Sequence, residues 1–122
     1  NSKIRQYSTI HSDTFINLLK HASALVGNSS CGIIETPFLK IPSVNIGTRQ
    51  QGRTKSETVI SVGYDKNEIK KAITKVIYDK KFLAKVKKSK SLYGDGKASK
   101  KIVKILEQIN LSTITIQKQM TY

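Results

Sequence analysis

The chain has 122 residues and a formal net charge of +14, from 22 Lys and Arg against 8 Asp and Glu. This length suits one domain or part of a larger one, and the charge favours acidic partners such as nucleic acid, anionic lipid or phosphorylated ligands. A single cysteine excludes an internal disulfide, and because no apolar run approaches ~20 residues and no signal peptide is visible, we expect a cytoplasmic protein without a membrane span.

The first third of the chain predicts two strands and two helices. Residues 3–9 alternate and are compatible with a strand, and Ser12 is a suitable N-cap for a helix whose apolar side chains recur at helical spacing. The apolar run over residues 24–27 predicts a buried strand. Residues 33–39 predict a short helix, which Pro42 keeps from extending.

The middle of the chain predicts two more strands on either side of a polar loop. Residues 43–46 and 59–62 are rich in β-branched apolar side chains. Residues 47–55 between them are polar and contain two glycines and two arginines, which is typical of a loop. Because strands alternate with helices, the pattern predicts an α/β fold with a parallel sheet and helices on its faces.

The next segment predicts two amphipathic helices. Asp65 and Glu68 have the spacing of a capping box, and apolar residues within 69–77 form a stripe at helical spacing. A break is expected near Asp79, and residues 82–86 continue a second helix. The many lysines of these helices are most simply solvated faces.

The C-terminal segment predicts a turn followed by a third helix. Residues 93–96 are a turn in which Asp95 is the expected N-cap, and apolar residues within 102–109 form another stripe. Residues 111–122 are compatible with a strand, an extended arm or a disordered tail.

Small and polar residues are concentrated in one turn, residues 27–32, with the sequence GNSSCG. Since Val26 ends a strand and Gly32 opens a helix, the turn lies at the sheet edge where α/β proteins bind ligands. Free N–H groups and the helix dipole attract anions there, Ser29 and Ser30 add hydroxyl donors, and glycine allows close approach. The alternative is a loop that only caps a helix.

Two further features of the sequence suit a nucleotide. Glu35 follows one turn into the helix, and a carboxylate accepts hydrogen bonds from the paired hydroxyls of a ribose. Arg49 and Arg53 follow the next strand at the same edge, and arginine is well suited to bidentate phosphate contact. This pattern favours phosphates on the serines and ribose on the carboxylate, while a solvated loop remains the alternative for the arginines.

Other kinds of site are disfavoured. The sequence contains neither GxGxxG nor GxxxxGK[ST], and one cysteine with two scattered histidines makes no metal cluster. Cys31 stands at a helix start, where the dipole lowers a thiol pKa, but neither His11 nor His21 can be placed beside it as a base. We expect Cys31 to line the turn as a small residue, and His21 to interact with the C-terminal end of its helix.

Three motifs together resemble a known family. The segments GNSSCGIIETP, PSVNIGTRQQGR and YGDGKASKKIVKIL, in this order and spacing, closely resemble the C-terminal part of UDP-N-acetylglucosamine 2-epimerases. The resemblance is greatest to the hydrolysing type used in sialic and related nonulosonic acid synthesis, and covers roughly residues 15–109. It implies a Rossmann-like parallel sheet with flanking helices, as part of the C-terminal half of a two-domain GT-B-like fold.

The resemblance also implies roles for particular residues. The UDP-binding residues would be Ser29, Ser30, Gly32, Glu35, Arg49, Arg53 and His11. The two serines match diphosphate-binding serines, Glu35 matches the carboxylate that holds the ribose, and Arg49 matches an arginine near the phosphates, with Arg53 as a further candidate. Ile10 and His11 match the region of the uracil ring.

The family's reaction needs more than this chain contains. The enzymes eliminate UDP from UDP-N-acetylglucosamine and add water to the glycal, giving N-acetylmannosamine or a related sugar. Their acid/base carboxylates lie in an N-terminal domain, and a histidine-bearing segment lies early in the C-terminal one; neither region is present. We therefore expect residues 1–110 to be an incomplete UDP-binding domain, inactive alone, and 111–122 a tail. The expected partners are UDP or a UDP-sugar, the N-terminal domain and further enzyme copies, with no cofactor.

The high positive charge supports an alternative function, a small basic module that binds nucleic acid or an anionic surface. Against it, aromatic residues are not interleaved with the basic ones as base stacking requires, and no nucleic-acid reader motif is present.

Overall fold

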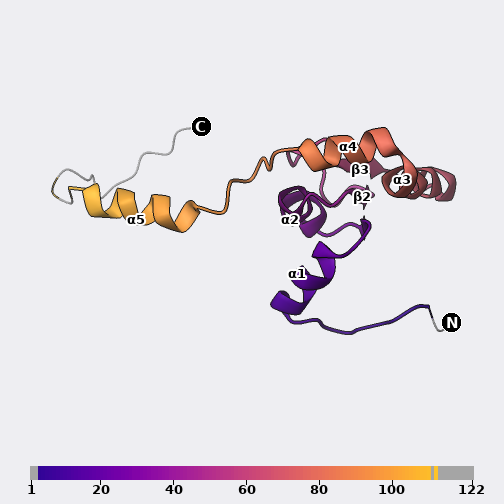
Figure 1. The fold of residues 1–122 in the computed structure, drawn as a ribbon, viewed down its shortest axis with the longest axis horizontal. Helices are drawn as coiled ribbons and strands as arrows, with labels where there is room; N and C mark the ends of the chain where they lie inside the picture. The colour runs from indigo at the N-terminus through magenta and orange to yellow at the C-terminus, as the bar shows by residue number, and fades with distance from the viewer. Residues whose placement is uncertain (1–2, 111, 113–122) are drawn as a thin grey trace.

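The structure, a computed structural model, describes residues 3–110 and 112. Its centre is a sheet of three parallel strands in the order β1-β2-β3, namely β1 (Leu25–Gly27), β2 (Ser43–Ile46) and β3 (Val59–Val62) (Figure 1). The predicted α/β class, the parallel sheet and the bounds of its last two strands are confirmed. The first strand starts at Leu25 rather than Ala24 and is only partly buried.

Helices cover both faces of the sheet because side chains alternate along β2. Val44 points toward α3 (Lys66–Tyr78) and α4 (Lys80–Lys88), where a core of buried apolar side chains forms. Ser43 points to the other face, where its hydroxyl donates to the Gly32 carbonyl of α2 (Cys31–Leu39). The members of the buried core are Val44, Ala72, Val76, Phe82 and Val86.

Helix α2 leads directly out of the polar turn. It begins at Cys31, two residues before the predicted start, and ends at Leu39 as predicted. Lys40 ends it in the left-handed conformation, with φ 58°, so the helix has already stopped before Pro42. Ser43 and Thr36 both donate their hydroxyls to the Gly32 carbonyl, which ties the first turn of α2 to β2.

Asp65 caps α3 as predicted, and Asp79 lies at the predicted break between the helices, where it also caps α4. The Asp65 carboxylate accepts hydrogen bonds from the N–H groups of Asn67 and Glu68, both at 2.9 Å. Asp79 ends α3 and caps α4, accepting from Lys81 at 2.9 Å and Phe82 at 3.0 Å. The Phe82 N–H is the main cause that holds the pKa of Asp79 below its usual range.

The N-terminal segment differs from the prediction. Residues 3–10 are irregular and almost entirely exposed, so the predicted strand over residues 3–9 is wrong: no strand among the described residues lies beside it to complete a ladder. Helix α1 (Ser12–Lys20) has His11 as its N-cap, because the His11 carbonyl accepts the Phe15 N–H at 2.9 Å. Ser12 is the first helical residue. At the other end, His21 contacts the Asn17 carbonyl at 2.8 Å through Nδ1, as expected for a C-terminal partner.

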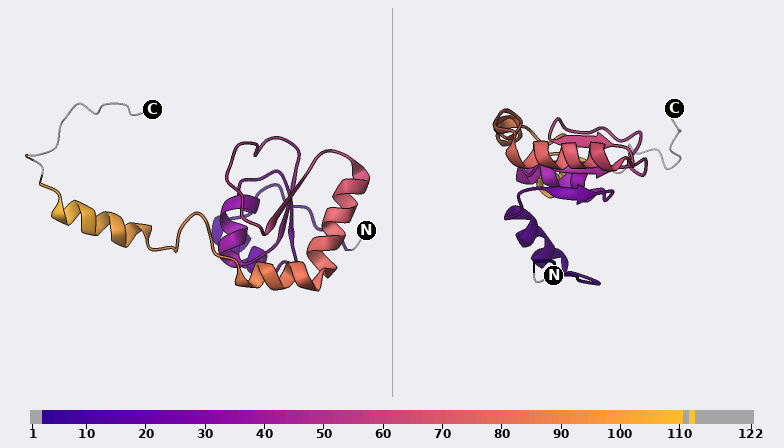
Figure 2. Two further views of the ribbon diagram at one scale, coloured as in Figure 1. Left: turned by 90° about the horizontal axis from the view of Figure 1, so that it is seen from above. Right: turned by 90° about the vertical axis from the view of Figure 1, so that its right-hand side faces the viewer.

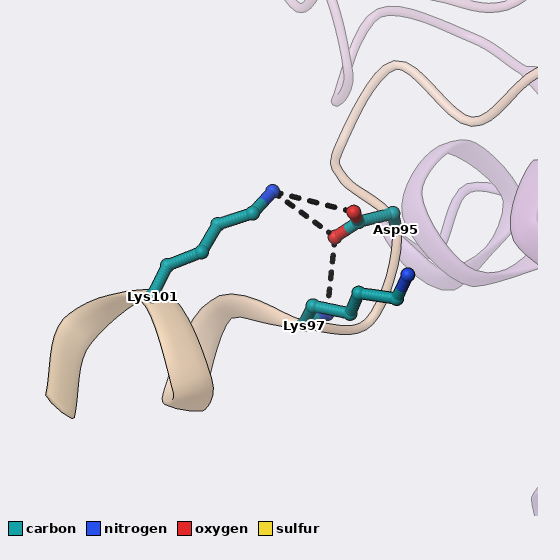
Figure 3. A network of polar contacts seen from close by, with 3 residues as sticks. All are labelled: Asp95, Lys97 and Lys101. Atoms are coloured by element: carbon teal, nitrogen blue, oxygen red, sulfur yellow. Dashed lines mark hydrogen bonds and ion pairs between the residues drawn. The ribbon is translucent and has the colours of Figure 1, made fainter. Parts of the chain in front are cut away.

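Helix α5 (Ala98–Gln108) is capped differently from the prediction. Its N-cap is Lys97, and Asp95 precedes it by two residues. The Asp95 carboxylate accepts the Lys97 N–H at 3.1 Å and pairs with the Lys101 ammonium at 3.3 Å (Figure 3). These contacts, the N–H first, hold the pKa of Asp95 below its usual range. Asp95 therefore stabilises the turn that precedes α5, although it is not the N-cap of the helix.

The apolar stripe of α5 is present but not buried against any described residue. The helix projects away from the sheet (Figures 1 and 2), and its large apolar side chains, together with that of the C-cap Ile109, are 39–62% exposed. They are Ile102, Val103, Ile105, Leu106 and Ile109. The predicted tail, residues 111–122, lies outside the described residues except for Ser112. Each helix in the described part of the chain is too short or too polar to cross a bilayer.

Candidate functional site

The polar turn lies where the sequence predicted it. β1 ends at Gly27 and α2 begins at Cys31, so residues 27–32 connect the carboxyl end of a strand to a helix N-terminus. The turn covers a cavity of about 210 Å³, which it lines together with the end of β2. The cavity residues are Leu25, Val26, Gly27, Asn28, Ser29, Gly32, Val44 and Asn45.

The backbone donors of the turn are less free than expected. The N–H of Cys31 bonds to Ser29 Oγ at 3.3 Å, and the N–H groups of Gly32 and Ile33 bond to the carbonyls of Ser29 and Ser30. The prediction of free N–H groups is wrong for these three, because the turn closes on itself. Ser29 Oγ accepts the hydrogen bond from Cys31, and its own hydroxyl proton is still available for donation. The Ser30 side chain makes no cap hydrogen bond. The available donors are therefore mainly hydroxyls.

The loop that follows β2 is fastened to this turn. Gln50, only 4% exposed, donates from Nε2 to the Asn28 carbonyl at 2.9 Å. Arg49 Nη1 lies 3.5 Å from Asn28 Oδ1, at the limit of a hydrogen bond. The predicted proximity of Arg49 to the serine turn is thereby confirmed. Arg53 lies further along the loop and is exposed.

A glycine sets the course of that loop. Gly47 has φ +77°, which L side chains rarely adopt, and a Cβ there would collide with the ring of Tyr64. The Tyr64 hydroxyl in turn accepts the Thr48 N–H at 3.4 Å, directly before Arg49. The chain leaves β2 in the direction that brings the arginine back to the turn.

Glu35 lies beside a second hollow, on the same helix. This hollow of about 410 Å³ lies between α1, α2 and the segment 91–96, and its lining includes Glu35, Ile16 and Tyr93. Glu35 Oε2 is buried and has no hydrogen-bond partner among the described residues. An unpaired buried carboxylate oxygen is an acceptor that hydroxyl groups can satisfy. The Glu35 carboxylate therefore lies at a different hollow from the one that Ser29 lines.

The sequence profile of the UDP-N-acetylglucosamine 2-epimerase family matches residues 1–107. The chain belongs to this family. The resemblance noted from the three motifs is thereby confirmed, and the family's GT-B-like fold agrees with the parallel sheet and its helices.

Several curated relatives are similar to the chain over most of its length. The polysialic acid biosynthesis protein P7 of Escherichia coli is 37% identical over 105 residues, which are 86% of this chain and 27% of that protein. The hydrolysing GDP/UDP-N,N'-diacetylbacillosamine 2-epimerase of Campylobacter jejuni is 38% identical over 113 residues, 92% of this chain and 29% of the enzyme. A hydrolysing UDP-N,N'-diacetylbacillosamine 2-epimerase of Legionella pneumophila is 31% identical over 98% of this chain. The chain spans less than a third of the length of these relatives.

In this member of the 2-epimerase family, the cysteine of the turn is unsuited to nucleophilic chemistry. Cys31 is 8% exposed. Burial, followed by the negative charge of the nearby Glu35 carboxylate, raises the pKa of the Cys31 thiol to about 11. These effects outweigh the helix dipole, so the thiol is protonated at neutral pH. The expectation that Cys31 lines the turn as a small, unreactive residue agrees with this position.

We expect the Cys31 thiol to react slowly with iodoacetamide at pH 7–8, because it is both buried and protonated. Mass spectrometry of the intact protein after timed exposure measures the modified fraction. The same protein in denaturant is the control, and it should react at the rate of a free cysteine. Rapid modification of the native protein would contradict the raised pKa.

The structure does not bring every predicted residue to the turn. His11 caps the end of α1 that points away from the sheet (Figure 1), and its Nδ1 lies 3.9 Å from the Asp13 carboxylate. Its contact with uracil, and that of Ile10, therefore stay predictions. Gly32 is buried, and a Cβ there would meet Leu25 and Ser43 at ordinary distances of 3.5–3.6 Å. In the described part of the chain no three potential metal ligands gather.

Sequence reasoning missed three polar residues of the site. Asn28 receives both contacts from the loop, Gln50 makes the shorter of them, and Asn45 lines the cavity from β2. Asn45 left a detectable signal, since it is an amide between the apolar residues Val44 and Ile46 of β2. Asn28 and Gln50 left none, because their roles depend on how the loop folds back.

Proposed function

We propose that this chain supplies the UDP-binding part of a UDP-N-acetylglucosamine 2-epimerase, within the C-terminal half of a GT-B-like fold. The observation that carries the proposal is the contact of the Arg49 loop with the serine turn. It puts a guanidinium and two serine hydroxyls at the N-terminal end of α2, where the helix dipole also favours an anion. A diphosphate needs this combination of charge and directed donors.

The ligand divides along α2 in this proposal. Ser29, Ser30 and Arg49 donate to the diphosphate. Arg53 is a further cation on the loop of Arg49, and Gly32, which has no side chain, allows the ligand to approach the backbone closely. The ribose hydroxyls donate to Glu35, whose buried Oε2 has no partner among the described residues. The uracil ring lies toward Ile10 and His11.

These residues would assist the reaction by holding the leaving group. When the bond from the sugar to UDP breaks, negative charge develops on the diphosphate, and fixed donors stabilise it as it forms. The acid/base carboxylates that remove and return protons would come from the N-terminal domain of the enzyme. Residues 1–110 then form an incomplete UDP-binding domain followed by a tail, and incubation of this chain alone with UDP-N-acetylglucosamine should release no UDP above background.

Calorimetric titration of the full protein with UDP, UMP and uridine tests the proposal. We expect affinity to rise with each phosphate and binding to persist in moderate salt, because uracil and ribose contacts are insensitive to salt. A DNA or RNA oligonucleotide is the comparison ligand, since binding through counterion release falls steeply with salt. Tight, salt-sensitive oligonucleotide binding without any affinity for UDP would overturn the proposal in favour of the basic module.

A further inference from the structure

Asn45 is a buried amide whose hydrogen-bonding groups are unused. The residue is 3% exposed, and neither Nδ2 nor Oδ1 has a hydrogen-bond partner among the described residues. It also lines the cavity of about 210 Å³ beneath the serine turn. Buried polar groups in folded proteins are nearly always paired, so an amide with both ends unpaired requires an explanation.

The position of Asn45 in β2 sets the direction of its side chain. Side chains alternate along a strand, so Asn45 shares the α2 face with Ser43, whose hydroxyl already contacts Gly32. Asn45 lies two residues nearer the carboxyl edge. In register it sits beside Gly27, where even a Cβ would meet nothing within 4 Å. Asn45 therefore lies at the carboxyl end of the sheet on the α2 face, where it lines the cavity together with Gly27 and Ser29.

The fold itself gives no reason for an amide at this position. An apolar side chain of the same size would fill the site without an unpaired donor and acceptor, which generally makes such a replacement neutral or stabilising. Ser43 and Gln50 each donate to a backbone carbonyl, although Gln50 Oε1 is also unpaired among the described residues, whereas Asn45 has no partner for either group. What distinguishes Asn45 is the cavity in front of it.

We propose that Asn45 is a further ligand-binding residue of this site, donating from Nδ2 to a phosphoryl oxygen of the bound diphosphate. Oδ1 then accepts from a water or a hydroxyl in the cavity, which is large enough to hold one. The inference rests on the proposed UDP site. It adds to the hydroxyls and the guanidinium at the turn an uncharged donor that approaches from the sheet.

The test compares Asn45→Leu with Thr58→Val in the full protein. Thr58 is 0% exposed, and its Oγ1 also has no partner among the described residues. It lies directly before β3, at the amino end of the strand, whereas Asn45 lies near the carboxyl end of β2. Both changes remove an unpaired buried polar group, so both should leave the melting temperature equal or higher. Only Asn45→Leu should weaken UDP and inorganic pyrophosphate, by roughly 10- to 150-fold, with uridine unchanged. Calorimetric titration measures the affinity of each variant for UDP, inorganic pyrophosphate and uridine.

Each outcome bears on the inference. If the native protein binds UDP and Asn45→Leu binds it equally well, the role of Asn45 is wrong while the UDP site stands. Equal losses for uridine and pyrophosphate would show that Asn45 acts through the fold. If the native protein does not bind UDP, the proposed function itself fails. Should the leucine variant not fold, Asn45→Asp preserves the shape and should weaken UDP more as the pH rises, because a carboxylate repels phosphate.

Discussion

Replacing Arg49 by glutamine is expected to weaken UDP binding on the order of 100-fold, equivalent to about 2.8 kcal/mol. The guanidinium is the charged group that the structure holds at the serine turn, and glutamine keeps a polar side chain there without charge or a bidentate fork. The melting temperature should change little, because the anchor of the loop is the Gln50 contact rather than the longer Arg49 one. Calorimetric titration with UDP, UMP and uridine measures the effect.

Arg53→Gln is the matched control, since it removes the same charge from the same loop. Both arginines are exposed, but among the described residues only Arg49 contacts the serine turn, so for Arg53→Gln we expect a loss of a few-fold at most, which added salt should abolish because a charge without a fixed contact is screened. If the two variants lose the same affinity, the arginines act only through net charge. The geometric argument for Arg49 would then be wrong.

The frame of the fold could be predicted because its signals are local. Residues 43–46 and 59–62 are short segments rich in β-branched apolar residues and flanked by turn residues, and the cap at Asp65 and the break near Asp79 are also local signals. Alternation of such strands with helices is sufficient to predict a parallel sheet. Once the sheet is parallel, the serine turn and the arginine loop must share its carboxyl edge, which the structure confirms through Asn28.

The parts that were wrong depend on contacts distant in sequence. Residues 3–9 have a strand-like alternation, but a strand forms only beside another, and none of the described strands is adjacent. Asp95 is a good cap by residue type, yet its carboxylate reaches Lys97 and Lys101 from two residues before the N-cap. The amides of the serine turn were expected to be free, and the turn itself uses them.

The site was only partly predictable for the same reason. Ser29, Ser30 and Arg49 have side chains whose chemistry indicates phosphate. Asn45 does not, because its role depends on the face of β2 that it occupies and on the cavity in front of it. The hollow beside Glu35 likewise requires the segment 91–96 to return to α2, which no local pattern predicts.

Ser30→Ala and Glu35→Gln are expected to weaken the binding of different ligands. Ser30→Ala removes a donor to a charged group, worth about 1.5–3 kcal/mol, so UDP and UMP should weaken roughly 10- to 150-fold while uridine is nearly unchanged. Glu35→Gln preserves the shape but weakens an acceptor of the ribose hydroxyls. It should reduce uridine and UDP binding alike and leave inorganic pyrophosphate unaffected.

The structure separates this expectation from simple helix capping. The Ser30 side chain makes no cap hydrogen bond, so Ser30→Ala should hardly change the melting temperature. Ser29, the residue before the N-cap, accepts the Cys31 N–H at 3.3 Å, so Ser29→Ala should destabilise the protein as well as weaken UDP binding. Thermal melts and calorimetric titrations of all three variants measure both effects. If Ser30→Ala and Glu35→Gln lower stability equally and show no preference among ligands, residues 27–32 are only a turn that starts a helix.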